Sequence, residues 1–290
     1  MKHCKTDGRD RKKLMVMYIK QLEQKVPATE HVLVAIDHTA WGRPDAKTLK
    51  DRTHEYQEGV ILGQGYSTIA WIPEEQGSWA LPLLHEPIGS GESPIPKAAE
   101  QLKQVCKQTT NPVLAVLDRE YGNATWVLAQ AEIKADSLMR LRRNACLWSA
   151  PPAYSGRGRP RKHGQKMSLN DPETWSEADA MIEIAEAIAP RFPRRALHQA
   201  DEHPQLGQVK VRQWKNLHFY RAAGHLINLI LVERIKPMSS GQPFPPLWLA
   251  WVGARTLPLA TVWFKYLRRF GVDHWYRFAH RNDCIGHCLI

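Results

Sequence analysis

Val32-Leu33-Val34-Ala35-Ile36-Asp37 and Val113-Leu114-Ala115-Val116-Leu117-Asp118 are two short stretches with the same pattern, five apolar residues followed by an aspartate. A continuous apolar run of this length is typical of a strand buried on both faces, as in a sheet that helices cover on each side. The two stretches therefore predict two interior strands, each ending in an acidic residue.

The segment between these two stretches predicts how they are connected. Residues 59–72 and 79–87 have strand-like composition, and residues 73–77 form a turn between them. Residues 95–107 have helical spacing and lead directly into the second apolar run. Strand, strand, strand, helix, strand is the layout of a ribonuclease H-like core, in which the first and fourth strands lie side by side.

The second half of the chain changes character. A helix over residues 123–135 and a strand over 137–142 continue the core, whereas the residues that follow are rich in Pro, Gly and Arg. Strand-like runs then occur around residues 209–211 and 226–232, before a final helix over 259–281. We therefore predict an α/β fold: a ribonuclease H-like mixed sheet flanked by helices, with a β-rich insertion before the last helix.

This interpretation divides the chain into five parts. They are a basic N-terminal lead and helix (1–30), the first part of the core (31–146), the insertion (147–245), the last part of the core with the final helix (246–281) and a tail (282–290). The end of the chain places His280, Cys284, His287 and Cys288 close together in sequence, but their spacing matches no common zinc module.

The charge balance favours a polyanionic partner. The 290 residues include 40 Lys and Arg against 29 Asp and Glu, a formal net charge of +11, which suits nucleic acid or an anionic membrane surface. The most apolar stretch, residues 246–264, is interrupted by Arg255 and Pro258, so a membrane span is not expected. The five cysteines form no CxxC pair, and no signal-peptide core is evident, so we expect a cytoplasmic protein with reduced thiols.

The two aspartates point to metal-assisted phosphodiester chemistry. Such chemistry uses a carboxylate cluster that holds two divalent ions ~4 Å apart. Asp37 and Asp118, at the ends of neighbouring strands, would provide two of the ligands. The alternative is that each is a turn or helix-capping residue, a common role for an aspartate after a strand.

A third ligand is expected from the final helix. Tyr266, Arg269, Asp273 and His280 project from one narrow face at ~100° per residue. An acid, two basic groups and a phenol on one face suit a metal ion and a phosphate. The alternative is an amphipathic surface helix with ordinary charges on its polar side.

The spacing Tyr266-x2-Arg269-x3-Asp273-x6-His280 resembles the Y-(2)-R-(3)-E-(6)-K signature of bacterial insertion-sequence DDE transposases. Asp37 and Asp118 match the first and second acids of that family, and the resemblance extends from about residue 31 to residue 281. It implies metal-dependent DNA cleavage and strand transfer during transposition. Asp37, Asp118 and Asp273 would then be the catalytic residues and the ligands of two Mg²⁺ or Mn²⁺ ions.

The resemblance also implies the partners. Tyr266 and Arg269 would hold phosphates of double-stranded DNA, at the transposon ends and at the target, and a homo-oligomer on DNA is expected. The family's glutamate is Asp273 here and its lysine is His280, whose missing charge Arg281 would provide. Two roles are open for Glu120. It would be a substitute metal ligand, or, because side chains alternate between the two faces of a strand, it would face the solvent.

The length of the chain departs from the family pattern. Family members carry a helical segment before the first acid and further helices after the last, whereas Asp37 comes early and the chain ends at Ile290. A shortened copy is therefore expected. Two alternatives stay open: a catalytically decayed DNA-binding remnant, and a host nuclease on the same fold.

A separate basic segment lies inside the insertion. The order Arg157-Gly158-Arg159-Pro160-Arg161 resembles an AT-hook, which lies extended in the narrow minor groove of A·T-rich DNA. A basic linker is the alternative. Arg140 and Arg142, on a predicted strand near the carboxylates, add further positive charge for DNA binding.

Overall fold

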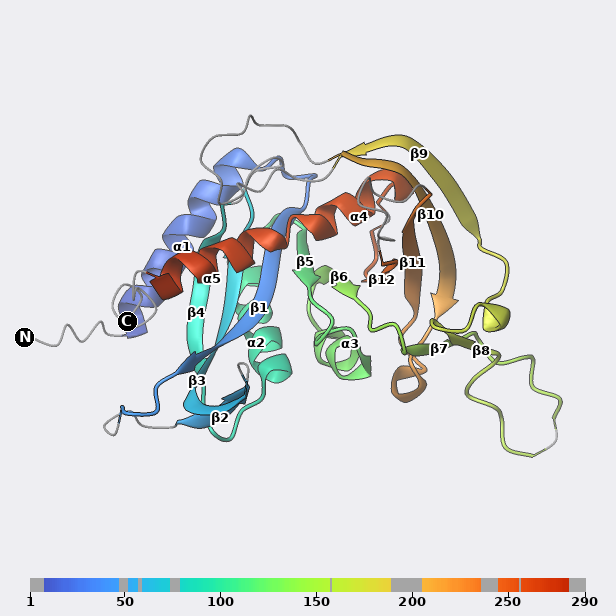
Figure 1. Ribbon diagram of the computed structural model, residues 1–290, viewed down its shortest axis with the longest axis horizontal. Coiled ribbons are helices and arrows are strands. Elements are labelled where there is room, and N and C mark those ends of the chain that lie inside the picture. The colour runs from blue at the N-terminus through green and yellow to red at the C-terminus, as the bar shows by residue number, and fades with distance from the viewer. Residues whose placement is uncertain are drawn as a thin grey trace, which may run out of the picture. The chain divides into compact units, whose positions relative to one another are not determined.

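The computed structural model describes residues 8–46, 52–56, 59–73, 79–156, 158–188, 205–235, 245–255 and 257–281, and it has a mixed α/β architecture (Figure 1). The chain forms two compact units. Unit 1 contains Met1–Ala115, Ile133–Ala135 and Arg268–Ile290, and unit 2 contains Val116–Glu132 and Asp136–Leu267.

Unit 1 is built on an antiparallel meander. Its elements are α1 (Gly8–Lys25), β1 (Val32–Gly42), β2 (Thr53–Tyr56), β3 (Val60–Trp71), β4 (Leu81–Ile88), α2 (Pro94–Cys106), the start of β5 (Val113–Leu117) and α5 (Phe270–Arg281). The strand order is β2-β3-β1-β5, and β4 also pairs with β3. The predicted elements up to β5 occur in the predicted order, and β2 is an additional short strand that the sequence did not predict.

Strands β1 and β5 are neighbours, as the sequence predicts. The backbone N–H of Val32 donates to the carbonyl oxygen of Pro112 at 2.8 Å, so the two strands begin side by side and run parallel. All five residues of β5 are buried, and so are the first six residues of β1. The near-continuous apolar character of both strands follows from this burial.

The prediction that β1 ends at Asp37 is wrong. Strand β1 continues to Gly42, and its pairing with β3 extends as far as Gly42 opposite Gly63. Residues 32–37 are buried, whereas residues 38–42 are half-buried. Asp37 therefore marks the point at which burial decreases. The strand itself persists because β3 is long enough to provide backbone partners beyond it.

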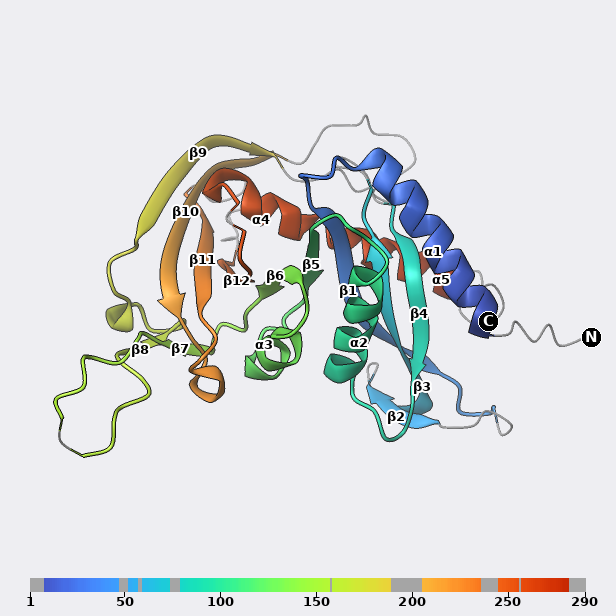
Figure 2. The same cartoon turned by 180° about the vertical axis from the view of Figure 1, so that it is seen from behind.

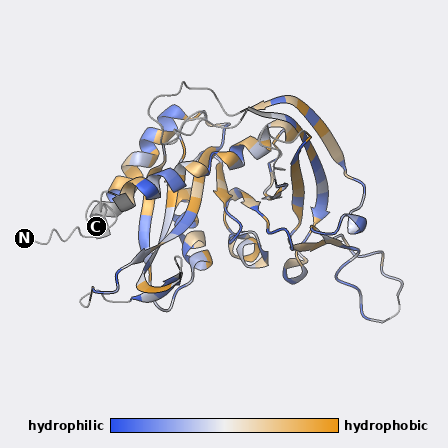
Figure 3. Cartoon of the chain, viewed as in Figure 1, coloured by the Kyte–Doolittle hydropathy of each residue, from blue (hydrophilic) through white to orange (hydrophobic). Residues whose placement is uncertain are grey.

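Helices cover both faces of the unit 1 sheet. Helix α2 contacts β1, β3 and β4, and helix α5 contacts β1; α5 lies in front of the sheet in Figure 1 and α2 in front of it in Figure 2. Gln101 of α2 is fully buried, and its side chain accepts from the Ser67 hydroxyl at 2.8 Å and donates to the Ser67 carbonyl at 3.1 Å. Apolar residues concentrate in the strands and on the inner helix faces (Figure 3).

The N-terminal segment forms helix α1, which packs within unit 1. The sequence alone did not indicate this role. Met15, Ile19 and Leu22 lie three to four residues apart and are buried, and the helix contacts β4. Near its end, the Glu23 carboxylate accepts from the Thr110 backbone N–H at 2.8 Å and from the Thr109 hydroxyl at 2.9 Å. The carboxylate thus ties α1 to the loop between α2 and β5.

We expect Glu23→Gln to lower the free energy of unfolding by about 1 kcal/mol at pH 7. The Thr110 N–H, the largest contributor, lowers the pKa of Glu23 below its usual value near 4.5. A lowered pKa in the folded state stabilises the protein above the unfolded pKa, and this stabilisation is lost as the pH falls through the folded pKa. Urea denaturation at pH 7 and pH 3 tests this, with Glu30→Gln as the matched control; a difference that persists unchanged at pH 3 contradicts the assignment.

Unit 2 extends from the end of β5 into a second set of strands. Its elements are α3 (Ala124–Gln130), β6 (Ala135–Arg140), β7 (Cys146–Trp148), β8 (Lys166–Ser168), β9 (Ala180–Ile188), β10 (Gln205–Leu217), β11 (Ile227–Arg234), β12 (Leu247–Val252) and α4 (Leu259–Leu267), with short 3-10 turns at Pro172–Thr174 and Tyr220–Ala222. The order is β5-β6-β12-β11-β10-β9, and β7 and β8 form a separate pair.

The β-rich part of the chain shares a sheet with the core strands. Strand β12 pairs antiparallel with β6 on one side and with β11 on the other. Strand β12 therefore links β6 to the strands β11, β10 and β9 within unit 2. Trp175, Trp214 and Trp248 pack together on this sheet, with ring centroids 5.1 to 6.1 Å apart.

The predicted final helix is two helices. α4 ends at Leu267 and α5 begins at Phe270, so the expectation of one continuous helix over 259–281 is wrong. At the break, the buried Arg268 donates from Nη2 to the carbonyl oxygen of Ile72 at 2.9 Å. Among the described helices, none combines the length and the apolar character that crossing a membrane requires.

Candidate active site

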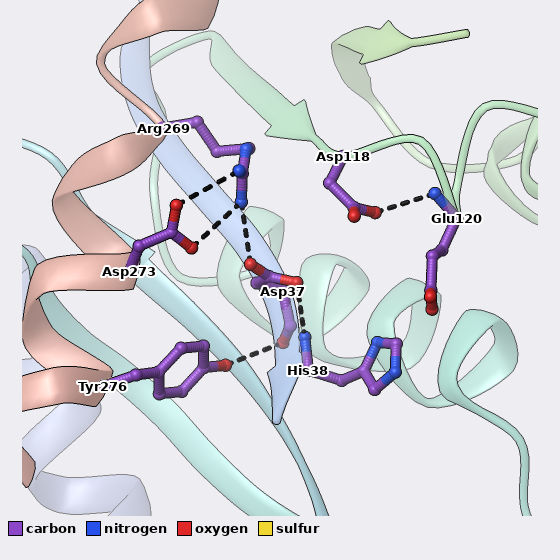
Figure 4. Close-up of polar contacts among 7 residues, drawn as sticks. All are labelled: Asp37, His38, Asp118, Glu120, Arg269, Asp273 and Tyr276. Carbon is purple, nitrogen blue, oxygen red and sulfur yellow. Dashed lines mark hydrogen bonds and ion pairs between the residues drawn. The ribbon is translucent and has the colours of Figure 1, made fainter. Parts of the chain in front are cut away.

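Asp37 is the centre of a polar cluster in unit 1 (Figure 4). The residue is 9% exposed on β1. Its Oδ2 accepts from Nη1 of Arg269 at 2.7 Å, and its Oδ1 accepts from the backbone N–H of His38 at 2.9 Å. Both oxygens of this carboxylate are therefore engaged, and the side chain has one defined orientation.

Arg269 joins Asp37 to Asp273. Its Nη1 also donates to Oδ1 of Asp273 at 3.4 Å, and its Nη2 donates to Oδ2 at 3.3 Å. The guanidinium is nearly buried, as is the side chain of Asp37, while Asp273 is 28% exposed. Charge-assisted hydrogen bonds of this kind are strong where water is largely excluded. The two carboxylates thus converge on one shared cation.

The side chain of Tyr276 binds the backbone of Asp37. The sequence analysis did not identify this residue. Its hydroxyl donates to the carbonyl oxygen of Asp37 at 3.0 Å. Burial, and then the negative charge of Asp37, raise the pKa of Tyr276 well above its usual value, so the hydroxyl stays a donor. Its spacing, three residues after Asp273, is the signal that places it on the same face of α5.

The position of α5 follows from its own pattern. Val272, Tyr276 and Ala279 are buried and recur every three to four residues, which gives one apolar stripe that packs on β1. Arg268 anchors the start of the helix to the end of β3. Together these contacts hold Arg269 and Asp273 over Asp37.

Asp118 lies in unit 2, directly after β5, as the sequence predicts. Its Oδ1 accepts from the backbone N–H of Glu120 at 2.8 Å, which is the geometry of an Asx turn. The expectation that Glu120 lies on a strand is wrong, because the chain forms a turn at this residue. Helix α3 follows, and the Asn123 side chain caps its start by accepting from the backbone N–H groups of Thr125 and Trp126. Glu120 is exposed at this turn.

The other predicted DNA contacts are dispersed. Arg140 is half-buried on β6, Arg142 is exposed after it, and Arg159 and Arg161 are exposed in the loop between β7 and β8. Tyr266 is 1% exposed on α4. Three predicted residues lie outside the described set: Arg157, and the side chains of His280 and Arg281.

Aromatic residues hold the base of the loop that carries Arg159 and Arg161. His163 and His218 share a hydrogen bond of 2.9 Å between Nδ1 and Nε2, and His163 stacks on Tyr220 at 4.4 Å. Burial, and then the neighbouring His163, lower the pKa of His218. In the loop itself, the Tyr154 hydroxyl donates to the Gly158 carbonyl at 2.8 Å, and Gly158 has a φ of 75°, which favours glycine.

The carboxylates fit a divalent ion by their chemistry. Mg²⁺ and Mn²⁺ prefer carboxylate oxygens, and Asp37 and Asp273 already converge on a cation. That cation is the guanidinium of Arg269, so an ion bound by both carboxylates would replace it. Within the described ranges, no group of three or more Asp, Glu, His or Cys side chains is arranged to hold a metal ion.

The comparison with protein families agrees with this chemistry. A family profile described as "DDE superfamily endonuclease" matches residues 5–200. One similar solved structure is titled "Cryo-EM structure of piggyBac transposase synaptic complex with hairpin DNA (SNHP)", with 10% sequence identity and a TM-score of 0.40. That match covers 87% of this chain and 41% of the length of the other. No curated protein matches the chain.

Proposed function

The chain belongs to the family of DDE superfamily endonucleases, and from that premise we propose that it is a DDE transposase of a bacterial insertion sequence. The reaction is metal-dependent cleavage of DNA followed by strand transfer during transposition. The observation that carries the proposal is the convergence of Asp37 and Asp273 on the buried guanidinium of Arg269. The YREK-like spacing of Tyr266, Arg269, Asp273 and His280 supports the assignment.

We assign Asp37, Asp118 and Asp273 as the ligands of two Mg²⁺ or Mn²⁺ ions. Such ions activate the attacking hydroxyl and stabilise the leaving oxygen of a phosphodiester. Support for Asp118 comes from the sequence, because Asp118 is the first residue after the buried strand β5 and matches the second acid of the family that the sequence resembles.

The residues around Asp37 have positioning roles in this proposal. The His38 N–H and the Arg269 guanidinium hold the Asp37 carboxylate in one rotamer, and the Tyr276 hydroxyl holds the backbone of β1 against α5. If Asp37 and Asp273 held a divalent ion, the guanidinium of Arg269 would be available to bind a DNA phosphate. Its planar fork of donors matches phosphate oxygens.

The proposed partner is double-stranded DNA, at transposon ends and at the target, with the protein acting in the cytoplasm and forming a homo-oligomer on DNA. The formal charge of +11 supports a polyanionic partner. The proposed contacts are Tyr266, Arg269, His280 and Arg281 of the YREK-like segment and its neighbour, Arg140 at the end of β6 and Arg142 after it, and Arg157, Arg159 and Arg161 of the AT-hook-like segment.

The proposal is tested with the full chain on two substrates. The first is supercoiled plasmid with Mg²⁺, Mn²⁺ or EDTA, and the second is a duplex carrying the inverted repeats found beside the gene. Metal-dependent cleavage at the repeats, followed by joining of the 3′-hydroxyl to a target plasmid, is expected. Cleavage without joining or end preference indicates a host nuclease, and DNA binding without cleavage indicates a catalytically decayed remnant.

We expect Asp273→Glu to raise Mg²⁺-dependent cleavage on the order of 10-fold, because ~1 Å of misplacement costs up to ~100-fold in rate. Asp273 is the more exposed carboxylate of the pair and makes the longer bonds to Arg269, 3.3 and 3.4 Å. One further methylene would bring the carboxylate closer to Asp37. Adding His280→Lys, which restores a full charge, is expected to increase the rate further.

The ratio of cleavage rates in Mg²⁺ and Mn²⁺ is the measurement, because Mg²⁺ requires stricter ligand geometry. Asp45→Glu, at an exposed aspartate of the same unit, is the matched control. An unchanged ratio in a folded, DNA-binding Asp273→Glu variant shows that side-chain length at this position does not limit activity.

A further inference from the structure

Two adjoining cavities in unit 2 are lined by arginines. The larger, about 450 Å³, is lined by Arg119, Arg140, Arg142 and Arg143, together with Glu120, Leu141 and Asn144. The smaller, about 340 Å³, shares Arg119, Arg142 and Asn144 and extends toward Asn123 and Phe219. We call the four arginines and the space between them the arginine pocket. It lies where the chain leaves β5 and β6.

The lining of this pocket carries more positive than negative charge. Among the lining residues, Glu120 is the one acid. Within the part of the chain that the structure describes, no carboxylate forms an ion pair with any of the four arginines. Arg212 of the same unit contrasts with them, because it pairs with Glu233 at 2.6 Å. Four like charges are thus gathered in a concave site.

The chemistry of the pocket fits phosphate groups. Guanidinium groups present planar forks of donors that match phosphate oxygens, and the exposed Asn144 amide adds a neutral donor. The larger cavity, about 450 Å³, offers more space than one small ion needs, which suits an extended polyanion.

We propose that the arginine pocket binds the sugar-phosphate backbone of a nucleic acid strand. Arg119 follows Asp118 directly in the sequence, so the pocket holds the strand beside a proposed metal ligand. The identity of the ligand as nucleic acid rests on the proposed function. The pocket adds Arg119, Arg143 and Asn144 to the DNA-binding surface, next to Arg140 and Arg142.

The test compares the full chain with the double variant Arg119→Ser/Arg142→Ser, which removes the two arginines that both cavities share. Arg221→Ser, at an exposed arginine of unit 2 outside the pocket, is the control. Binding of a fluorescein-labelled 30-base-pair duplex is measured in EDTA between 50 and 200 mM KCl. We expect at least 10-fold weaker binding at 100 mM KCl for the double variant, and a salt slope reduced by about two.

Further variants and a second ligand distinguish the possible reasons for a negative result. Thermal midpoints show that the variants fold, and Arg119→Lys/Arg142→Lys, which keeps both charges, should recover most of the salt slope. Equal affinity and slope for wild type and the serine variant overturn the pocket but leave the proposed function intact. Inorganic pyrophosphate that binds wild type in calorimetry, while the duplex does not bind, overturns both, because the occupant is then a free phosphate compound.

Discussion

Asp37→Asn is expected to reduce metal-dependent DNA cleavage at least ~100-fold while leaving DNA affinity within about twofold. The substitution keeps the shape of the side chain but replaces one carboxylate oxygen with an amide that is a poor ligand for Mg²⁺. It also removes the charge that attracts Arg269 at 2.7 Å. Asp37 faces the protein interior, so it contributes little to the surface potential that attracts DNA.

Cleavage of supercoiled plasmid in Mg²⁺ and in Mn²⁺ measures this effect, and duplex binding in EDTA measures the affinity. Asp45→Asn, an exposed aspartate of the same unit, should behave as wild type. Asp118→Asn should show the same loss of cleavage if Asp118 shares the metal ions. Retention of cleavage by Asp37→Asn excludes this carboxylate as a metal ligand, and equal loss of binding and cleavage indicates misfolding.

Arg269→Met is expected to lower the free energy of unfolding by about 3 kcal/mol. Methionine keeps much of the volume of arginine but leaves the Asp37 carboxylate buried without its charged partner, and it also removes the contacts to Asp273. Removing one member of a buried ion pair is costly because the remaining charge stays desolvated. Denaturation in urea at pH 7 measures the loss.

A double-mutant cycle tests the cause of that loss. The variant Asp37→Asn/Arg269→Met should be more stable than Arg269→Met alone, because the buried charge is gone. Arg277→Met, an exposed arginine on the same helix, should change stability by less than about 0.5 kcal/mol. Additive effects of the Asp37 and Arg269 substitutions would contradict the coupling.

The interior strands of unit 1 could be predicted from local pattern. Apolar runs at residues 32–36 and 113–117 corresponded to buried residues, and the intervening predicted strands and helix occurred in the expected order. Burial on both faces forces an apolar side chain at every position, which makes such strands visible in a single sequence. Strand β12 was missed because its run, Leu247–Val252, is part of an apolar stretch that continues toward the final helices.

The helix face around Asp273 could be predicted only in part. The spacing of Arg269 and Asp273 predicted their shared face, and the structure joins them by hydrogen bonds. Tyr266 was expected on that face, but the interruption at Arg268 and Arg269 places it on a different helix. Helical periodicity extends only as far as the helix is continuous.

The sequence alone determined the order of the elements, the two interior strands and the acids that follow their apolar runs, because all of these depend on neighbouring residues. Tertiary structure alone decided the break before α5 and the contacts around Asp37. Arg268 binds a carbonyl 196 residues away, Arg269 binds a carboxylate 232 residues away, and Tyr276 binds a carbonyl 239 residues away. Contacts between residues so far apart in the sequence depend on the packing of the whole unit, so they cannot be predicted from the pattern of neighbouring residues.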